Sequence, residues 1–185
     1  MKASRQLKAR NIALTGFRAT GKSSIGRLLA RYLGWKFVDM DERLVESFGQ
    51  DIESWVRLHG WESFREAESK LLKAMAGEAG LIVATGGGAT LKAANRELLR
   101  NHFLVVWLKA SADTIYTRLT RDPNTPSQRP PLTVLPLREE IEQLLLDRSR
   151  FYEETADLAI DTEGRPAQSL ASELEKTLRQ RLPMD

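Results

Sequence analysis

The sequence predicts an α/β domain of three layers, in which helices cover both faces of a parallel sheet. Short, continuous apolar runs alternate with longer stretches of helical pattern along the 185 residues. This is the order of parallel strands that are buried on both faces and joined by crossover helices. A glycine-rich turn joins the first apolar run to the first helical stretch. At this length we expect a single domain over residues 1–185.

The strands are expected where apolar runs are too short and too continuous for amphipathic helices. In chain order these runs are Asn11–Thr15, Lys36–Val38, Leu81–Thr85, Phe103–Leu108 and the weaker Leu158–Ile160. The first helix is predicted over 24–33, directly after the glycine-rich turn, and further helical patterns lie between the later strands.

The turn Gly16–Ser23 matches G-x-x-x-x-G-K-[ST], the phosphate-binding P-loop. Glycines let the backbone curl so that successive N–H groups point at phosphate oxygens, and the following helix N-terminus adds partial positive charge. Lys22 is placed to reach the β- and γ-phosphates, and the Ser23 hydroxyl to ligate Mg²⁺. The strand before the turn and the helix after it make a chance match improbable, so the motif predicts nucleotide binding.

Two regions interrupt the alternation of strands and helices. Residues 42–78 hold two or three successive helical patterns and no strand, which predicts a helical subdomain beside the sheet. Residues 122–137 hold five prolines and neither a helical nor a strand pattern. A long loop of this kind is usually functional or disordered, and in a phosphate-transferring protein we expect a lid that excludes water.

Polar and glycine-rich segments follow the second and third strands, and parallel strands bring their carboxyl ends to one edge. Asp39 and Asp41 follow the second strand, and an extended chain would place both on one face, one toward Mg²⁺ and one toward an acceptor. Helix capping by Asp39, with Glu42 completing a capping box, is a compatible alternative. Gly86–Gly88 follow the third strand, where ligands could approach the backbone, although a tight turn would also use glycine.

Two arginines fall on the apolar stripes of predicted helices. Arg65 lies four residues after Trp61, and Arg148 lies seven residues after Ile141. An inward arginine needs an anionic partner, which for Arg65 is either Glu68 within the helix or an anionic substrate. Two such arginines could grip a carboxylate through bidentate contacts.

Arg129, in the proline-rich loop, resembles the mobile arginine that neutralises a transferring phosphoryl group, with an ordinary surface arginine as the alternative.

Composition restricts the classes of protein further. The chain has no cysteine, which excludes a disulfide framework, thiolate catalysis and zinc–thiolate sites. The net charge of +3 is too small to indicate a nucleic-acid partner. No apolar run approaches the roughly 20 residues of a membrane span, and the basic segment 1–10 lacks the apolar core of a secretory signal. We therefore expect a cytoplasmic protein with neither a nucleic-acid nor a membrane partner.

Taken together, the motifs resemble those of the shikimate kinase family. They run in family order along about residues 11–166: Gly16–Ser23 with Ser24-Ile25-Gly26, Asp39-Met40-Asp41, Phe64-Arg65, Gly86–Ala89, Arg129-Pro130, and Arg148 with Tyr152. The resemblance implies a nucleoside-monophosphate-kinase-like P-loop fold whose five strands are ordered 2-3-1-4-5. It also implies Mg²⁺-dependent transfer of phosphate from ATP to the 3-hydroxyl of shikimate, in chorismate and aromatic amino acid biosynthesis.

The resemblance also implies roles for individual residues. Asp41 would hold the shikimate hydroxyls and could act as the base, and Gly87 would contact shikimate through its backbone. Arg65 and Arg148 would bind the carboxylate. Nucleotide-binding residues would be Ala19, Thr20, Gly21, Lys22, Ser23 and Ser24 around the phosphates, with the lid residue Arg129 and, near adenine, Arg165. Ser23 and, through water, Asp39 would hold Mg²⁺, while Lys22 and Arg129 would assist catalysis.

Three residues depart from the family pattern. Arg18 and Ala19 stand where an apolar residue and a glycine are frequent, and Arg18 adds a charge beside the triphosphate; Pro131 stands where leucine is usual. A gluconate-type kinase of the same fold is the nearest alternative. A GTPase-like switch is weaker, since Asp161–Gly164 spells D-x-x-G near the C-terminus without an N-K-x-D signature. A nucleic-acid-binding ATPase is disfavoured by the small charge. The expected partners are ATP and shikimate, and the expected state is a monomer.

Overall fold

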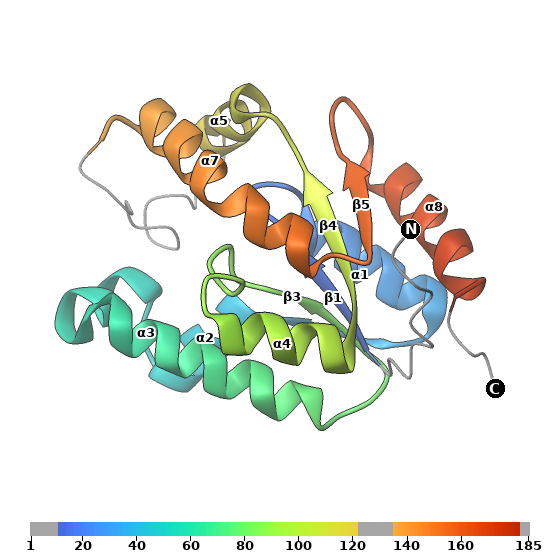
Figure 1. Ribbon diagram of the computed structural model, residues 1–185, viewed down its shortest axis with the longest axis horizontal. Helices are drawn as coiled ribbons and strands as arrows, with labels where there is room; N and C mark the ends of the chain where they lie inside the picture. The colour runs from blue at the N-terminus through green and yellow to red at the C-terminus, as the bar shows by residue number, and fades with distance from the viewer. Residues whose placement is uncertain (1–10, 122–134, 182–185) are drawn as a thin grey trace.

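Five parallel strands form the central sheet of the computed structural model, in the order β2-β3-β1-β4-β5 (Figure 1). The structure describes residues 11–121 and 135–181. The strands are β1 (Asn11–Thr15), β2 (Lys36–Asp39), β3 (Leu81–Ala84), β4 (Phe103–Lys109) and β5 (Leu158–Asp161). All five expected strands are present, with ends that differ by at most one residue, and the implied strand order is confirmed.

Helices cover both faces of the sheet, which confirms the three layers (Figure 1). They are α1 (Lys22–Leu33), α2 (Met40–Phe48), α3 (Ile52–Ala76), α4 (Ala93–His102), α5 (Ala112–Arg121), α7 (Leu137–Thr155) and α8 (Ala167–Arg179). Helices α1 and α8 pack together on one face, while α3 and α4 pack on the other. Helix α7 packs against α5, against α4 and against strand β4 of the sheet.

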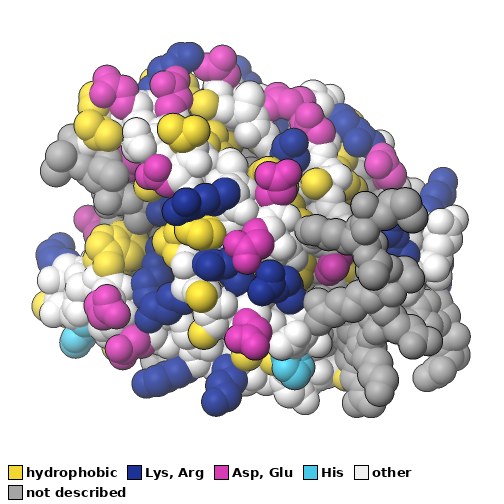
Figure 2. Space-filling model, in the orientation of Figure 1, with side chains coloured by type: hydrophobic (Ala, Val, Ile, Leu, Met, Phe, Trp, Pro, Cys, Tyr) yellow, Lys and Arg dark blue, Asp and Glu magenta, His cyan; other side chains and the backbone are white. Residues whose placement is uncertain are grey.

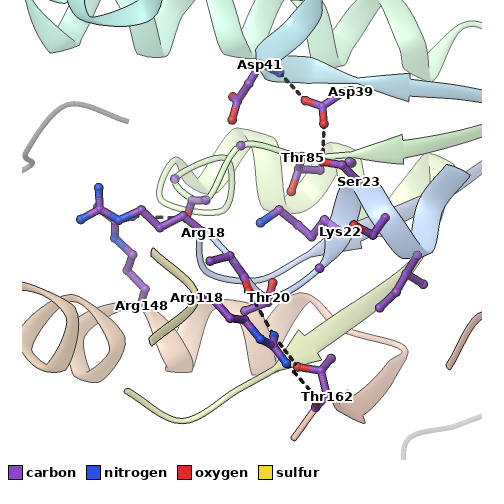
Figure 3. A pocket seen from close by; sticks show the side chains of 18 of the residues that line it. Arg18, Thr20, Lys22, Ser23, Asp39, Asp41, Thr85, Arg118, Arg148 and Thr162 are labelled. Atoms are coloured by element: carbon purple, nitrogen blue, oxygen red, sulfur yellow. Dashed lines mark hydrogen bonds between the residues drawn. The ribbon is translucent and has the colours of Figure 1, made fainter. Parts of the chain in front are cut away.

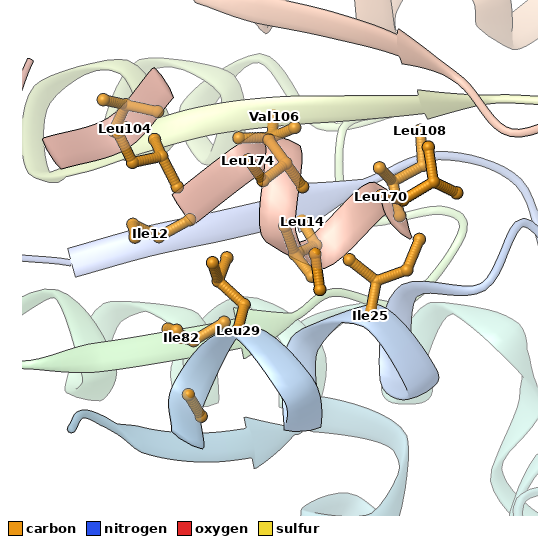
Figure 4. Packing of buried hydrophobic residues seen from close by; sticks show 13 residues of the cluster. Ile12, Leu14, Ile25, Leu29, Ile82, Leu104, Val106, Leu108, Leu170 and Leu174 are labelled. Atoms are coloured by element: carbon orange, nitrogen blue, oxygen red, sulfur yellow. The ribbon is translucent and has the colours of Figure 1, made fainter. Parts of the chain in front are cut away.

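Alternate residues of β1 explain why its sequence is continuously apolar. Ile12 and Leu14 join the cluster with Leu29 of α1 and Leu174 of α8 (Figure 4). Ala13, between them, joins the cluster on the opposite face. A strand whose two faces are both covered must be apolar at every position.

Residues 42–78 fold as predicted into successive helices without a strand. Helix α3 is kinked at Gly60, where φ is 79° and ψ is 165°, so two helical halves meet there. An apolar cluster of Leu44, Ile52 and Phe64 joins α2 to both halves of α3. Most of the expected lid at 122–137 lies outside the described residues. In the described ranges, no helix has the length and apolar character needed to cross a membrane.

Candidate active site

A pocket of about 480 Å³ opens at the carboxyl ends of β1, β2 and β3, where the sequence places its polar and glycine-rich segments. The P-loop lines one side of it. Asp41, Arg65 and Gly86–Gly88 also line it, and Arg148 of α7 reaches in (Figure 3). The structure therefore brings all of the described candidate residues to one cavity. Arg129, in contrast, lies outside the described residues.

The P-loop backbone requires glycine at one position and tolerates its absence at another. At Gly16 φ is 135°, and a Cβ placed there would lie 2.5 Å from the carbonyl oxygen of Leu108, so no side chain fits. Ala19 has a φ of 60°, in the left-handed region that disfavours side chains. This conformation explains why glycine is frequent at that position, and alanine costs about 1 kcal/mol there.

Lys22 and Ser23 emerge from the first turn of α1, which begins two residues earlier than predicted because Gly21 takes the left-handed conformation at its N-cap. The Lys22 ammonium donates hydrogen bonds to the carbonyl oxygens of Gly16 at 3.0 Å and Phe17 at 2.8 Å. Lysine therefore braces the loop that would surround the phosphates. The Ser23 hydroxyl donates to Asp39 Oδ2 at 2.5 Å.

Asp39 both caps α2 and faces the P-loop. Its Oδ1 accepts from the backbone N–H of Asp41 at 3.0 Å and of Glu42 at 3.4 Å. The capping alternative is thus correct, although Glu42 pairs with Arg27 on α1 and does not complete the box. The expectation of an extended chain over Asp39–Asp41 is wrong, because the cap starts the helix at Met40. Both carboxylates nevertheless line the pocket.

Asp41 lies in a strongly perturbing environment. Burial, followed by the neighbouring carboxylates of Asp39 and Glu68, raises its pKa from 3.8 to about 6, while Lys22 and Arg65 oppose the rise. A buried carboxyl group flanked by like charges holds its proton more tightly. Its pKa is close to that of an effective general base near neutral pH.

We expect any reaction that uses the Asp41 carboxylate as a base to show a kcat/KM that decreases below about pH 6, with unit slope, as this carboxylate becomes protonated. The free energy of unfolding should depend on pH with the opposite sign. Between pH 3.8 and about 6 the folded state binds more protons at this group than the unfolded state. The contribution of Asp41 to the free energy of unfolding therefore falls as the pH rises through that window. A pH–rate profile measures the first effect, and a profile without an acidic limb would contradict it.

Arg65 and Glu68 form an ion pair within α3, with Arg65 Nη1 2.8 Å from Glu68 Oε2. Burial raises the pKa of Glu68, although the guanidinium beside it opposes the rise. The Arg65 guanidinium also lies against the rings of Trp61 and Phe64. The internal partner considered for Arg65 therefore exists, and it holds the guanidinium at the wall of the pocket, where an anion could also reach it.

The glycine triplet Gly86–Gly88 does more than form a turn, because it lets the backbone approach the side chains of α3 closely. A Cβ at Gly86 would lie 2.3 Å from Glu68 Oε1, and one at Gly88 would lie 2.4 Å from Arg65 Cζ. The backbone of the turn thus packs directly on the ion pair of α3, which only residues without side chains permit.

Replacing Gly88 by alanine should displace the Arg65 guanidinium while leaving the fold intact, because the group that must move is the end of a flexible side chain. We expect the KM for the acceptor to rise about tenfold, as one charged contact is lost, with a melting temperature within a few degrees of the wild type. Steady-state kinetics and thermal denaturation test this. Gly77→Ala, at a helix end outside the pocket, is the matched control; an unchanged KM in Gly88→Ala would contradict the prediction.

Arg148 is 6% exposed and projects from α7 toward the glycine turn. Its Nη1 lies 3.4 Å from the carbonyl oxygen of Gly87, and its guanidinium lies 5.8 Å from the Phe17 ring centroid. Arg150, two residues later, is exposed, as its position off the apolar stripe predicts. The pocket thus holds two inward arginines, one from α3 and one from α7.

Two further arginines, Arg118 and Arg165, also line the pocket. Arg165 lines the pocket and pairs with Glu173 of α8. Arg118 of α5 donates to the carbonyl oxygens of Ala19 at 3.1 Å and Thr162 at 3.0 Å. Arg118 is not among the site residues predicted from the sequence, although it follows the buried Ile115 by three residues and so carries the same signal as Arg65.

Arg18 was expected to add a charge beside the triphosphate, but the structure shows that charge paired within the chain. Its guanidinium is paired with Glu140, which is buried in the first turn of α7. An ion pair with a buried carboxylate neutralises most of that charge locally. The departure from the family pattern at this position is therefore balanced within the chain.

Comparison with known proteins identifies a common family. The family model described as shikimate kinase matches residues 18–179. A shikimate kinase of Geobacter sulfurreducens is 40% identical, over 92% of each chain. Shikimate kinase 2 of Dickeya chrysanthemi is 39% identical, over 91% of this chain and 95% of its own.

A solved structure is similar over almost the whole chain. The shikimate kinase from Acinetobacter baumannii, in complex with shikimate, superposes with a TM-score of 0.87 at 32% identity, covering 96% of this chain and 97% of the other.

Proposed function

The chain belongs to the shikimate kinase family, and from that membership we propose that it transfers the γ-phosphoryl group of ATP to the 3-hydroxyl of shikimate, giving shikimate 3-phosphate and ADP. The observation that carries the proposal is the pocket itself. A phosphate-binding loop shares a single cavity with an acceptor site that contains the Asp41 carboxylate and two arginines, Arg65 and Arg148. This is the arrangement that in-line transfer between two bound substrates requires.

The acceptor is held by opposite charges and activated by Asp41. Arg65 and Arg148 bind the shikimate carboxylate from two directions, and Asp41 accepts hydrogen bonds from its hydroxyls. As the 3-hydroxyl oxygen bonds to the γ-phosphorus, the bond from phosphorus to the leaving oxygen of ADP breaks and the hydroxyl proton passes to Asp41. With a pKa of about 6 this carboxyl group is mainly ionised at pH 7, so it can take the proton.

The donor is held by the P-loop. Backbone N–H groups from Ala19 to Ser24 surround the phosphates, and Lys22 moves from the loop carbonyls to the transferring phosphoryl group. Arg165 lies near the adenine of the nucleotide. Arg118 donates a hydrogen bond to the carbonyl oxygen of Thr162, in the segment that follows β5. Arg129 and the lid over 122–137 remain predictions, because residues 122–134 lie outside the described residues.

The donor set at Ser23 and Asp39 fits Mg²⁺. A hydroxyl and a carboxylate lie 2.5 Å apart at the nucleotide side of the pocket, and Mg²⁺ commonly takes one or two such protein oxygens with waters and phosphates. Ser23 would bind the ion directly and Asp39 through water. When bound, the ion neutralises charge on the phosphates.

Within one domain over residues 1–185, residues 42–78 form the acceptor-binding subdomain, because Asp41 precedes it and Arg65 lies inside it. We assign a cytoplasmic, monomeric enzyme, with ATP and shikimate as its partners.

The proposal is tested by coupled ADP release with shikimate or gluconate as acceptor. We expect turnover with shikimate and little with gluconate, and ³¹P NMR should identify the monophosphorylated product. Both acceptors carry a carboxylate, so the two arginines do not separate them; family membership favours shikimate. Absence of ADP release with shikimate would refute the proposal. Chelation of divalent metal with EDTA should abolish turnover, and added Mg²⁺ should restore it.

A further inference from the structure

Tyr152 is a buried polar group for which the proposed mechanism has no role. It lies on α7 and is 1% exposed, yet its hydroxyl donates to the carbonyl oxygen of Gly87, 65 residues away in the chain. Its ring stacks on Trp107 of β4, with the ring centroids 5.9 Å apart. Burial raises the pKa of Tyr152 to about 12, so near neutral pH the hydroxyl keeps its proton and remains a donor.

Helix α7 supplies two donors to the same carbonyl. Arg148 and Tyr152 are four residues apart and therefore share one face of the helix. Arg148 Nη1 lies 3.4 Å from Gly87 O, at the long end of hydrogen-bond distances. Tyr152 therefore makes the principal contact that holds this carbonyl. Arg148, with a weaker contact there, keeps most of its donors for other partners.

The orientation of that carbonyl determines where the next N–H group points. The described chain contains no cis peptide bond, so the Gly87 carbonyl and the Gly88 N–H point in opposite directions from one planar unit. Among the residues that the structure describes, neither the Gly87 nor the Gly88 N–H has a hydrogen-bond partner. Both glycines line the pocket. Two donors without protein partners at a pocket wall point to a ligand oxygen.

The far end of the turn is held separately by α4. Asn95 Nδ2 donates to Ala89 O at 3.0 Å, and Arg96 Nη1 donates to Thr90 O and Leu91 O, both at 2.9 Å. Arg96 also pairs with Glu154 of α7. Figure 2 shows Lys and Arg side chains interspersed with Asp and Glu over the middle of this face of the molecule. Helix α4 thus fixes residues 89–91, and the Gly87–Gly88 peptide depends on α7.

We propose that Tyr152 is a positioning residue for the acceptor: its hydroxyl fixes the Gly87–Gly88 peptide so that the Gly88 N–H, next to the N–H of Gly87, meets an oxygen of the bound shikimate. The inference rests on the proposed function for the identity of the acceptor. Glycines restrict their own backbone less than other residues, so without this anchor the peptide can rotate and the Gly88 N–H can lose its orientation.

The test is Tyr152→Phe, which removes only the hydroxyl and keeps the ring on Trp107. We expect the Kd for shikimate, measured by calorimetry, to rise about tenfold, and the KM for ATP to change less than twofold. Hydrogen–deuterium exchange of the peptide covering 85–91 should become faster in the unliganded variant. Tyr32→Phe, on α1 and outside the pocket, is the matched control and should leave all three quantities unchanged.

Three outcomes would overturn the inference: an unchanged Kd for shikimate, equal losses for both substrates, or a variant that is unfolded at the assay temperature. The last two would make Tyr152 a purely structural residue. If the wild-type protein neither binds nor phosphorylates shikimate, the proposed function fails instead. In that case the exchange rate of residues 85–91 still tests whether Tyr152 holds the turn.

Discussion

Asp41→Asn should lower kcat with shikimate by about 10²–10⁴-fold, the range that general-base catalysis contributes. Asparagine keeps the size of the side chain and can still hydrogen-bond the acceptor hydroxyls, but it cannot accept the proton. The KM for ATP should change little, because in the proposed site Lys22 and the P-loop backbone, not Asp41, surround the phosphates. Steady-state kinetics with each substrate varied in turn measures the separate effects.

The same substitution should stabilise the protein. Burial and the neighbouring carboxylates of Asp39 and Glu68 raise the pKa of Asp41 from 3.8 to about 6, so its charged form is disfavoured in the folded state at pH 7. Removing the charge should increase the free energy of unfolding by about 1–3 kcal/mol. Asp147→Asn, an exposed position on α7, is the control and should change neither quantity. A kcat within threefold of the wild type would remove Asp41 from the role of base.

Arg148→Ala should raise the KM for shikimate by about 10²-fold, with a much smaller change in the KM for ATP. A charge-assisted bidentate contact with a carboxylate is among the strongest polar contacts available, and removing one of the two proposed arginines leaves the carboxylate with Arg65 alone in a buried site. Arg148→Lys should recover only part of the affinity, because a point charge cannot reproduce the planar fork.

Arg150→Ala is the matched control for Arg148. Arg150 lies two residues away on the same helix, carries the same charge and is exposed, so a general change in the field of the protein would affect both variants. We expect Arg150→Ala to keep wild-type constants for both substrates. Equal increases in the two KM values for Arg148→Ala would indicate a collapse of α7 rather than the loss of a carboxylate contact. Thermal denaturation of both variants separates these cases.

The sequence predicts the fold closely because each element carries a local signal. Continuous apolar runs such as Asn11–Thr15 identify strands covered on both faces, and the glycines of the P-loop identify the turn. Strand ends were within one residue. The start of the first helix was predicted less well: α1 begins at Lys22, two residues before the predicted start, because Gly21 takes the left-handed conformation at its N-cap.

The site residues that could be predicted are those whose position in the sequence is itself unusual. Asp41, Arg65 and Arg148 could be selected because a charge on an apolar stripe or after a buried strand needs a partner. Arg118 gave the same signal three residues after Ile115 and was overlooked. The extended arrangement of Asp39 and Asp41 was wrong, since the capping carboxylate ends the strand and begins α2 in one step.

By itself, the sequence determined the order of elements, the phosphate-binding loop and the charged residues that a pocket would need, because these depend on neighbours in the chain. Only the tertiary structure decided which distant polar groups meet: Arg18 forms an ion pair with Glu140, 122 residues away, and Tyr152 donates a hydrogen bond to the Gly87 carbonyl, 65 residues away. It also showed that Asp41 holds its proton more tightly than an ordinary aspartate. Burial, distance between charges and the packing of glycine against guanidinium arise only when distant segments meet.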